Sequence, residues 1–120
     1  NISSRDILNV YTSTINYQAA VLASKVTDTI KEVKDMRAIK TLNRDLLWAM
    51  QTPQGVNRSL YLKAINRANE ESYYGTDDVE LLEKYLGINA VIVPGRNNFK
   101  LTTDQDIELC EIIIRSKTNV

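Results

Sequence analysis

The apolar and polar positions at the start of the chain follow first a helical and then a strand-like pattern. Residues 4–15 carry apolar side chains at helical spacing. These side chains share one face, which holds Ile7, Val10, Tyr11 and Ile15. The next run, QAAVLAS at 18–24, is almost continuously apolar, as in a strand that is covered on both sides. The pattern therefore predicts a helix followed by a buried strand of a parallel α/β sheet.

A β-hairpin is predicted next, because two short alternating runs surround a charged turn. The runs are VTDTIKEV and AIKTL, and the turn is Lys34–Arg37. Both faces of this hairpin carry many charges, so we expect it to lie outside the core. The pattern alone leaves two interpretations open, a solvated excursion or an arm that reaches a partner.

The middle of the chain predicts a strand and then a helix. A turn at 43–45 leads into LLWAMQ, a strand that ends in the polar turn QTPQG at 51–55. Asn57 or Ser59 can cap the helix, which we expect to reach about Tyr73.

The last third predicts a helix, a strand and a final helix. Asp77 and Asp78 stand at the start of the first helix, and Gly87 ends it. The run NAVIV at 89–93 is a buried strand. Thr102 or Thr103 caps the final helix, which we expect to end near Arg115. Its inward side chains should be Ile107, Cys110, Ile113 and Ile114. The resulting architecture is an α/β sandwich with a protruding hairpin.

Composition narrows the possible functions. The chain has 120 residues, enough for one domain or part of one. Its 15 basic and 15 acidic residues cancel, which argues against binding nucleic acid or a membrane surface through bulk charge. No apolar run approaches the roughly 20 residues of a membrane span, and we expect no signal peptide. Cys110 is the only cysteine, so we expect a reducing, cytoplasmic location.

The absence of histidine excludes several kinds of site within this chain. Ser-His and Cys-His nucleophiles and histidine metal sites are not possible. The remaining reactive side chains are lysine, arginine, carboxylates, hydroxyls and amides. That set suits the handling of phosphate groups by charge and positioning.

Four polar clusters interrupt the pattern, and none of them is decisive when it is taken alone. Asp28, Thr29 and Lys31 lie in VTDTIK, and Arg44 follows the hairpin. A hydrophilic strand and a solvated charge would explain these two clusters. In the third cluster, Pro53 should hold Thr52 in an extended conformation, although a turn at a strand end would also fit.

The fourth cluster runs from Arg96 to Asp106 and contains Lys100. We expect Lys100 on a short extended piece between a Pro-Gly turn and a helix start, at the rim of the sheet where ligands bind. Helix capping explains the threonines here but not Lys100, Asn97 or Asn98. Lys100 is therefore a candidate phosphate contact, and simple solubility is the competing explanation.

Taken in order, these motifs resemble one enzyme family. The order is DTIK, an NR turn, W-x-x-QTPQ, TDD and N-x-K-x-T-T-x-x-D. It resembles the 2-C-methyl-D-erythritol 4-phosphate cytidylyltransferases of the non-mevalonate isoprenoid pathway. Ribitol-5-phosphate cytidylyltransferase is a close relative that shares QTPQ, TDD and the lysine segment. Lys31, directly after Asp28-Thr29-Ile30, favours the methylerythritol enzyme.

The resemblance implies a fold, a reaction and partners. The fold is a nucleotide-diphospho-sugar transferase-like α/β sandwich, and the hairpin at about Asp28–Arg44 is the arm of a homodimer. The reaction transfers CMP from CTP to the polyol phosphate, releases pyrophosphate and needs Mg²⁺. Neither nucleic acid nor a membrane is an expected partner.

The resemblance also implies residue roles. Thr29 and Arg44 reach the active site of the partner subunit and contact the sugar phosphate. Thr52 and Lys100 hold substrate in their own subunit. Arg44 and Lys100 are the expected catalytic cations of this segment.

Two departures from the family pattern stand out. The family more often has an aromatic residue after QTPQ, where this chain has Gly55-Val56. Residues 1–120 resemble only the C-terminal part of a single cytidylyltransferase domain. The Gly-rich loop and most of the nucleotide and metal sites belong to the other half, so we expect the segment alone to be inactive. A non-catalytic dimerisation domain of the same fold remains the alternative from another class.

Overall fold

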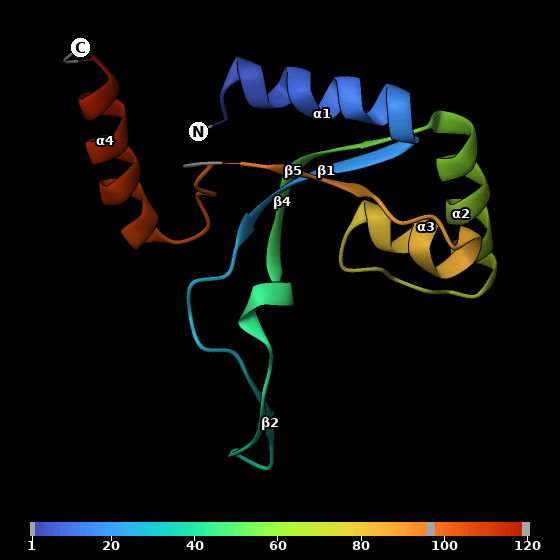
Figure 1. The fold of residues 1–120 in the computed structure, drawn as a ribbon, viewed down its shortest axis with the longest axis horizontal. Helices are drawn as coiled ribbons and strands as arrows, with labels where there is room; N and C mark the ends of the chain where they lie inside the picture. Colours follow the sequence, from blue (N-terminus) through green and yellow to red (C-terminus); the bar gives the residue numbers. More distant parts are fainter. Residues whose placement is uncertain (1, 96–97, 119–120) are drawn as a thin grey trace.

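The structure, a computed structural model, describes residues 2–95 and 98–118, and its elements follow the predicted order (Figure 1). Of these, residues 117 and 118 are described in their backbone only. The elements are α1 (Ser4–Tyr17), β1 (Ala19–Lys25), β2 (Lys31–Lys34), β3 (Arg37–Thr41), a 3₁₀ turn (Arg44–Leu46), β4 (Trp48–Val56), α2 (Arg58–Glu70), α3 (Asp78–Leu86), β5 (Val91–Pro94) and α4 (Asp104–Thr118).

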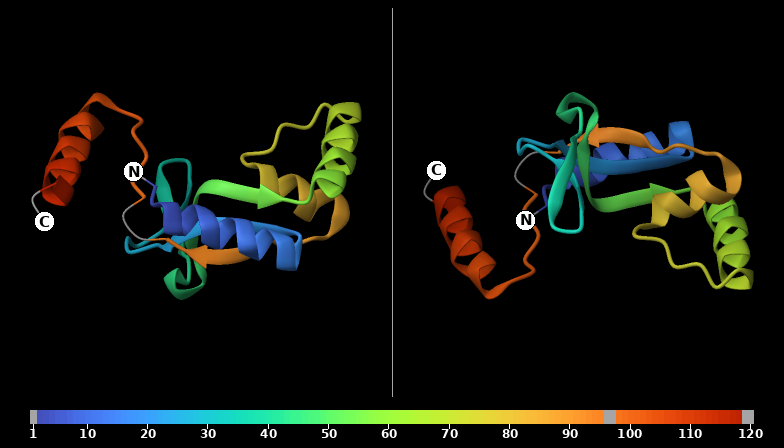
Figure 2. Two further views of the ribbon diagram at one scale, coloured as in Figure 1. Left: turned by 90° about the horizontal axis from the view of Figure 1, so that it is seen from above. Right: turned by 90° about the horizontal axis from the view of Figure 1, so that it is seen from below.

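The central sheet has three strands in the order β4-β1-β5. β1 pairs in parallel with β5 and antiparallel with β4, so the sheet is mixed rather than parallel. α1 lies on one face, and α2 and α3 lie together beyond the end of β4, toward the other face (Figures 1 and 2). The predicted α/β architecture is confirmed.

β1 is the centre of the core because both of its faces are covered. All five residues from Ala19 to Ala23 are buried. Ala19 packs with a cluster from α2 and α3 that includes Leu82, while Ala20 and Leu22 pack with Val10 of α1. The almost continuous apolar run predicted this burial correctly.

α1 begins as predicted, but its apolar face is only partly covered. Ser3 caps the helix by accepting a hydrogen bond from the backbone N–H of Asp6, 3.0 Å away. Val10 is buried, whereas Ile7, Tyr11 and Ile15 are exposed by 48%, 63% and 64%. These three exposed side chains line an open groove beside β4 instead of a packed core.

QTPQG is not a turn after a strand but part of β4. Val21 of β1 pairs with Gln54, and Ala23 pairs with Met50. One residue of β1, Leu22, therefore lies opposite the three residues 51–53 of β4, which makes this stretch a bulge. Pro53 has no N–H to donate to a ladder, which explains why it lies at the irregularity. The Thr52-Pro53 peptide bond is cis.

The predicted hairpin is confirmed as a separate two-stranded sheet of β2 and β3. Every residue of both strands is exposed. Asp35 and Met36 form its turn with positive φ angles of 49° and 61°. The hairpin extends away from the three-stranded sheet, as Figure 1 shows.

α4 stands apart from the sheet, which corrects the expectation of an inward apolar face (Figure 1). Ile107 and Ile114 are exposed, as are Leu109 and Ile112, while Cys110 and Ile113 are half-buried. No helix of the described part of the chain is long and apolar enough to cross a membrane.

Candidate functional site

A groove of about 470 Å³ brings together the β4 bulge and the segment after β5. Thr52 lines it from one side and Lys100 from the other, together with Gln51, Pro53 and Asn98. Both Thr52 and Lys100 are exposed, so a ligand can reach them. The sequence predicted these two residues separately, and the structure places them in one groove. Lys100 lies in an irregular segment rather than the short extended strand that we expected.

The two segments that carry this groove are joined by a hydrogen bond. The side-chain amide of Asn98 donates to the backbone oxygen of Thr52 at 2.5 Å. Asn97, the neighbouring amide that the sequence singled out, lies outside the described residues.

The two glutamines of QTPQ hold the bulge in place. The amide of Gln54 donates to the backbone oxygen of Gln51 at 3.4 Å and to Asp77 Oδ2 at 3.3 Å. The amide of Gln51 donates to Ser24 Oγ on β1 at 3.3 Å. The Oε1 atoms of both glutamines are buried without a partner. Amide side chains are therefore needed here to tie the bulge to β1 and to the start of α3.

A second cavity, of about 310 Å³, lies at the base of the hairpin. Thr29 and Arg44 both line it. Arg44 Nη1 donates to the backbone oxygen of Thr27 at 2.6 Å, and the 3₁₀ turn that begins at Arg44 is capped by Asn43. A guanidinium carries five N–H donors, so most of them remain for a ligand.

The two cavities share no lining residue, so the four predicted residues fall into two separate pairs. Each pair combines one cation with one hydroxyl. Within the described residues, neither Arg44 nor Lys100 forms an ion pair with a carboxylate. Both are therefore available to an anion such as a phosphate.

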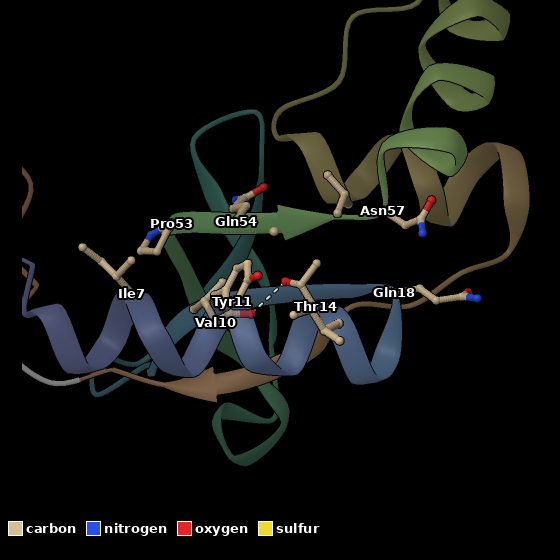
Figure 3. A pocket seen from close by; sticks show the side chains of 11 residues that line it. Ile7, Val10, Tyr11, Thr14, Gln18, Pro53, Gln54 and Asn57 are labelled. Carbon is tan, nitrogen blue, oxygen red and sulfur yellow. Dashed lines mark hydrogen bonds between the residues drawn. The ribbon is translucent and has the colours of Figure 1, made fainter.

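A third groove was not predicted from the sequence. It has a volume of about 720 Å³ and lies between α1 and β4, where Ile7, Tyr11 and Thr14 face Pro53 and Gln54 (Figure 3). The apolar face of residues 4–15 was a usable signal, but helical periodicity does not say what covers the face.

TDD is accounted for by helix capping and packing. Asp77 caps α3 by accepting from the N–H of Glu80 at 2.9 Å. Asp78 accepts from the hydroxyl of Tyr61 at 2.8 Å, which raises the pKa of that tyrosine. Hydrogen bonds from Tyr73 and then from Thr76 lower the pKa of Glu80 to about 2. These carboxylates stabilise the start of α3 and need no ligand to explain them.

The described residues contain no group of three or more histidine, cysteine, aspartate or glutamate side chains placed to hold a metal ion.

Comparison with known sequences gives one family. The profile described as 2-C-methyl-D-erythritol 4-phosphate cytidylyltransferase matches residues 2–116. A protein of that name from Aquifex aeolicus is 43% identical over 100 residues, which are 82% of this chain and 46% of the relative. Another from Halalkalibacterium halodurans is 38% identical over 117 residues, or 97% of this chain and 51% of the relative.

Solved structures agree with this result. A 2-C-methyl-D-erythritol 4-phosphate cytidylyltransferase from Thermus thermophilus superposes with a TM-score of 0.85 at 28% identity, covering 96% of this chain and 57% of that one. The enzyme from Francisella tularensis gives 0.80 at 33% identity, covering 92% and 52%. The chain thus spans about half the length of the relatives that it matches.

Proposed function

The chain belongs to the 2-C-methyl-D-erythritol 4-phosphate cytidylyltransferase family, and we propose that it supplies the acceptor-binding part of such an enzyme. The proposed reaction transfers CMP from CTP to 2-C-methyl-D-erythritol 4-phosphate and releases pyrophosphate. The observation that carries the proposal is the arrangement of Thr29, Arg44, Thr52 and Lys100 as two exposed pairs of one cation and one hydroxyl each.

The proposed chemistry needs no histidine. A phosphate oxygen of the acceptor attacks the α-phosphorus of CTP, and the bond to the bridging oxygen of the leaving pyrophosphate breaks. The nucleophile is already an anion, so the protein must bring two anions together and stabilise the charge at the attacked phosphorus. Arg44 and Lys100 would neutralise the acceptor phosphate, and Thr29 and Thr52 would orient it.

We further propose that the two pairs meet across a homodimer. Thr29 and Arg44 lie at the base of an exposed hairpin, in a cavity separate from that of Thr52 and Lys100. The hairpin also exposes apolar side chains, including Val33 and Ile39. An arm from one subunit that completes the site of the other accounts for both features.

Mg²⁺ and CTP belong to the proposal as groups that bind mainly to segments outside this chain. The metal would neutralise the triphosphate when bound. A cytoplasmic location accords with the single cysteine.

The direct test is a chimera in which this chain replaces the matching segment of the Aquifex aeolicus relative. The chimera should release pyrophosphate from CTP with methylerythritol phosphate and much more slowly with ribitol 5-phosphate. The unaltered relative serves as control. A folded, dimeric chimera without turnover would support the alternative of a non-catalytic dimerisation domain. A faster reaction with ribitol 5-phosphate would identify that compound, not methylerythritol phosphate, as the acceptor.

The chain by itself should bind CTP poorly and should not turn over. Measurable turnover by the purified 120-residue chain would contradict the proposal that the nucleotide site lies elsewhere.

A further inference from the structure

Lys100 lies on a segment that has few attachments to the sheet. β5 ends at Pro94, and the N–H of Gly95 donates to the backbone oxygen of Ala23 at 2.8 Å. A β-carbon at Gly95 would lie 2.8 Å from Leu22 Cγ, so the chain leaves the sheet in close contact with it. Beyond Lys100, the hydrogen bonds of Thr102 and Thr103 go to Asp106 at the start of α4, not to the sheet.

In the described part of this stretch, residues 98–101, Asn98 makes a hydrogen bond that joins the segment to the sheet. Its Nδ2 atom donates to the backbone oxygen of Thr52 at 2.5 Å, across 46 positions of sequence. Within described residues 98–103, this is the one hydrogen bond to β4. Thr52 lies in the bulge, outside the register with β1, so its backbone oxygen has to find a partner outside that ladder.

We propose that Asn98 is a positioning residue, which holds Lys100 beside Thr52 by anchoring its segment to the β4 bulge. Asn98 touches the backbone of Thr52 and leaves the Thr52 hydroxyl and the Lys100 ammonium available to the acceptor phosphate. The inference rests on the proposed function for its consequence in catalysis, but the anchoring itself is a property of this chain.

Apolar packing offers a competing explanation for the position of Lys100. Phe99 and Leu101 line the same groove as Ile2 and Ile7, and they could hold the segment without Asn98. The two explanations differ in what the loss of one amide does to Lys100.

The first test measures backbone order in the 120-residue chain by ¹⁵N relaxation. Asn98→Ala should lower the order parameter of Lys100 from about 0.85 toward about 0.6, the change from rigid to flexible backbone. Asn57→Ala is the matched control, because it removes an amide that caps α2 and should leave Lys100 ordered. An unchanged order parameter at Lys100 in Asn98→Ala would overturn the proposal in favour of apolar packing.

The second test is a double-mutant cycle in the chimera. Asn98→Ala should raise KM for methylerythritol phosphate about tenfold and leave KM for CTP unchanged, since a small misplacement weakens an oriented contact. Asn98→Asp should be at least as damaging, because a carboxylate cannot donate to the oxygen of Thr52. In a Lys100→Ala background, Asn98→Ala should have little further effect.

If the double variant raised KM for methylerythritol phosphate by the product of the two single effects, Asn98 would act independently of Lys100. That result would overturn the proposal. Full activity of Asn98→Asp would overturn it as well. An inactive chimera without these mutations would count against the proposed function alone, and the relaxation experiment would then decide whether Asn98 anchors the segment.

Discussion

Gly55 of β4 passes so close to Thr14 of α1 that a β-carbon at Gly55 would lie 2.0 Å from Thr14 Oγ1. The Thr14 hydroxyl cannot turn away without cost, because it donates to the backbone oxygen of Val10 at 2.7 Å. Gly55→Ala should therefore destabilise the chain by about 1–3 kcal/mol, the usual cost of overpacking. Urea denaturation of the 120-residue chain measures this effect.

Removal of the Thr14 hydroxyl is the control for that prediction. Adding Thr14→Ala to Gly55→Ala should recover much of the stability that Gly55→Ala alone loses. In the double variant the closest atom, Thr14 Oγ1, is gone, and the next lies 3.0 Å from the new β-carbon. Equal stability of Gly55→Ala and the parent would show that α1 and β4 are not packed this closely.

The same pair shows what the sequence could and could not predict. The helix at α1 follows from a local pattern and is confirmed. The approach of Gly55 to Thr14 joins residues 41 positions apart, so no local pattern contains it. The sequence identified Gly55 as a departure from the family but could not supply the packing reason.

In the candidate site, too, local motifs predict the residues but not how the fold brings them together. The motifs predict Thr52 and Lys100 separately, but they share a groove because the segment after β5 reaches the β4 bulge, where Asn98 donates to the backbone oxygen of Thr52. QTPQG was mistaken for a turn because a proline within a polar stretch gives the same signal in a turn and in a bulge. α4 shows the complementary error, because the apolar positions of a helix indicate a face that needs a partner without indicating which partner covers it.

Glu80 should make the stability of the chain depend on acid pH. Its carboxylate accepts hydrogen bonds from Tyr73 and Thr76, which lower its pKa from 4.5 to about 2. Because the folded-state pKa lies below the unfolded-state value, this contribution is complete above about pH 4.5 and is lost as the pH falls toward 2.

Glu80→Gln should therefore be less stable than the parent at pH 7, and the difference should vanish near pH 2. Urea midpoints across this range measure it. Glu83→Gln, which removes an exposed carboxylate from the same helix, is the matched control. Asp106, whose pKa is also lowered to about 2 by Thr102 and Thr103, keeps part of the acid dependence in every variant. A difference in urea midpoint between Glu80→Gln and the parent that stayed constant at all pH values would contradict this role.

Arg44→Ala in the chimera should raise KM for the sugar phosphate at least about tenfold, the cost of losing hydrogen bonds to a charged group. KM for CTP should change little. Arg37→Ala removes an exposed arginine from the same hairpin and is the matched control. Steady-state kinetics with each substrate varied in turn distinguish the two. A larger effect on CTP than on the sugar phosphate would assign Arg44 to the nucleotide instead.

The exposed apolar side chains of the hairpin should be needed for dimerisation. Val33 and Ile39 are exposed by 59% and 56%. Val33→Asp and Ile39→Asp should each shift the chimera from dimer to monomer in analytical ultracentrifugation and reduce turnover in proportion. Lys40→Ala, on the same strand as Ile39, is the polar control. Variants that stayed dimeric would show that the hairpin is exposed to solvent and does not form the dimer interface.

The central claim is that Thr29 and Arg44 of one subunit complete the site of Thr52 and Lys100 in the other. Arg44→Ala and Lys100→Ala chimeras, each with little activity, can be unfolded, mixed in equal amounts and refolded together. In a heterodimer, one shared site then receives both substituted residues. The other site receives the unmutated Arg44 of one subunit and the unmutated Lys100 of the other, and is intact. The account predicts recovery to about a quarter of the unmutated rate, from random pairing in a two-fold dimer. Activity that stays at the average of the two separate mutants would contradict it.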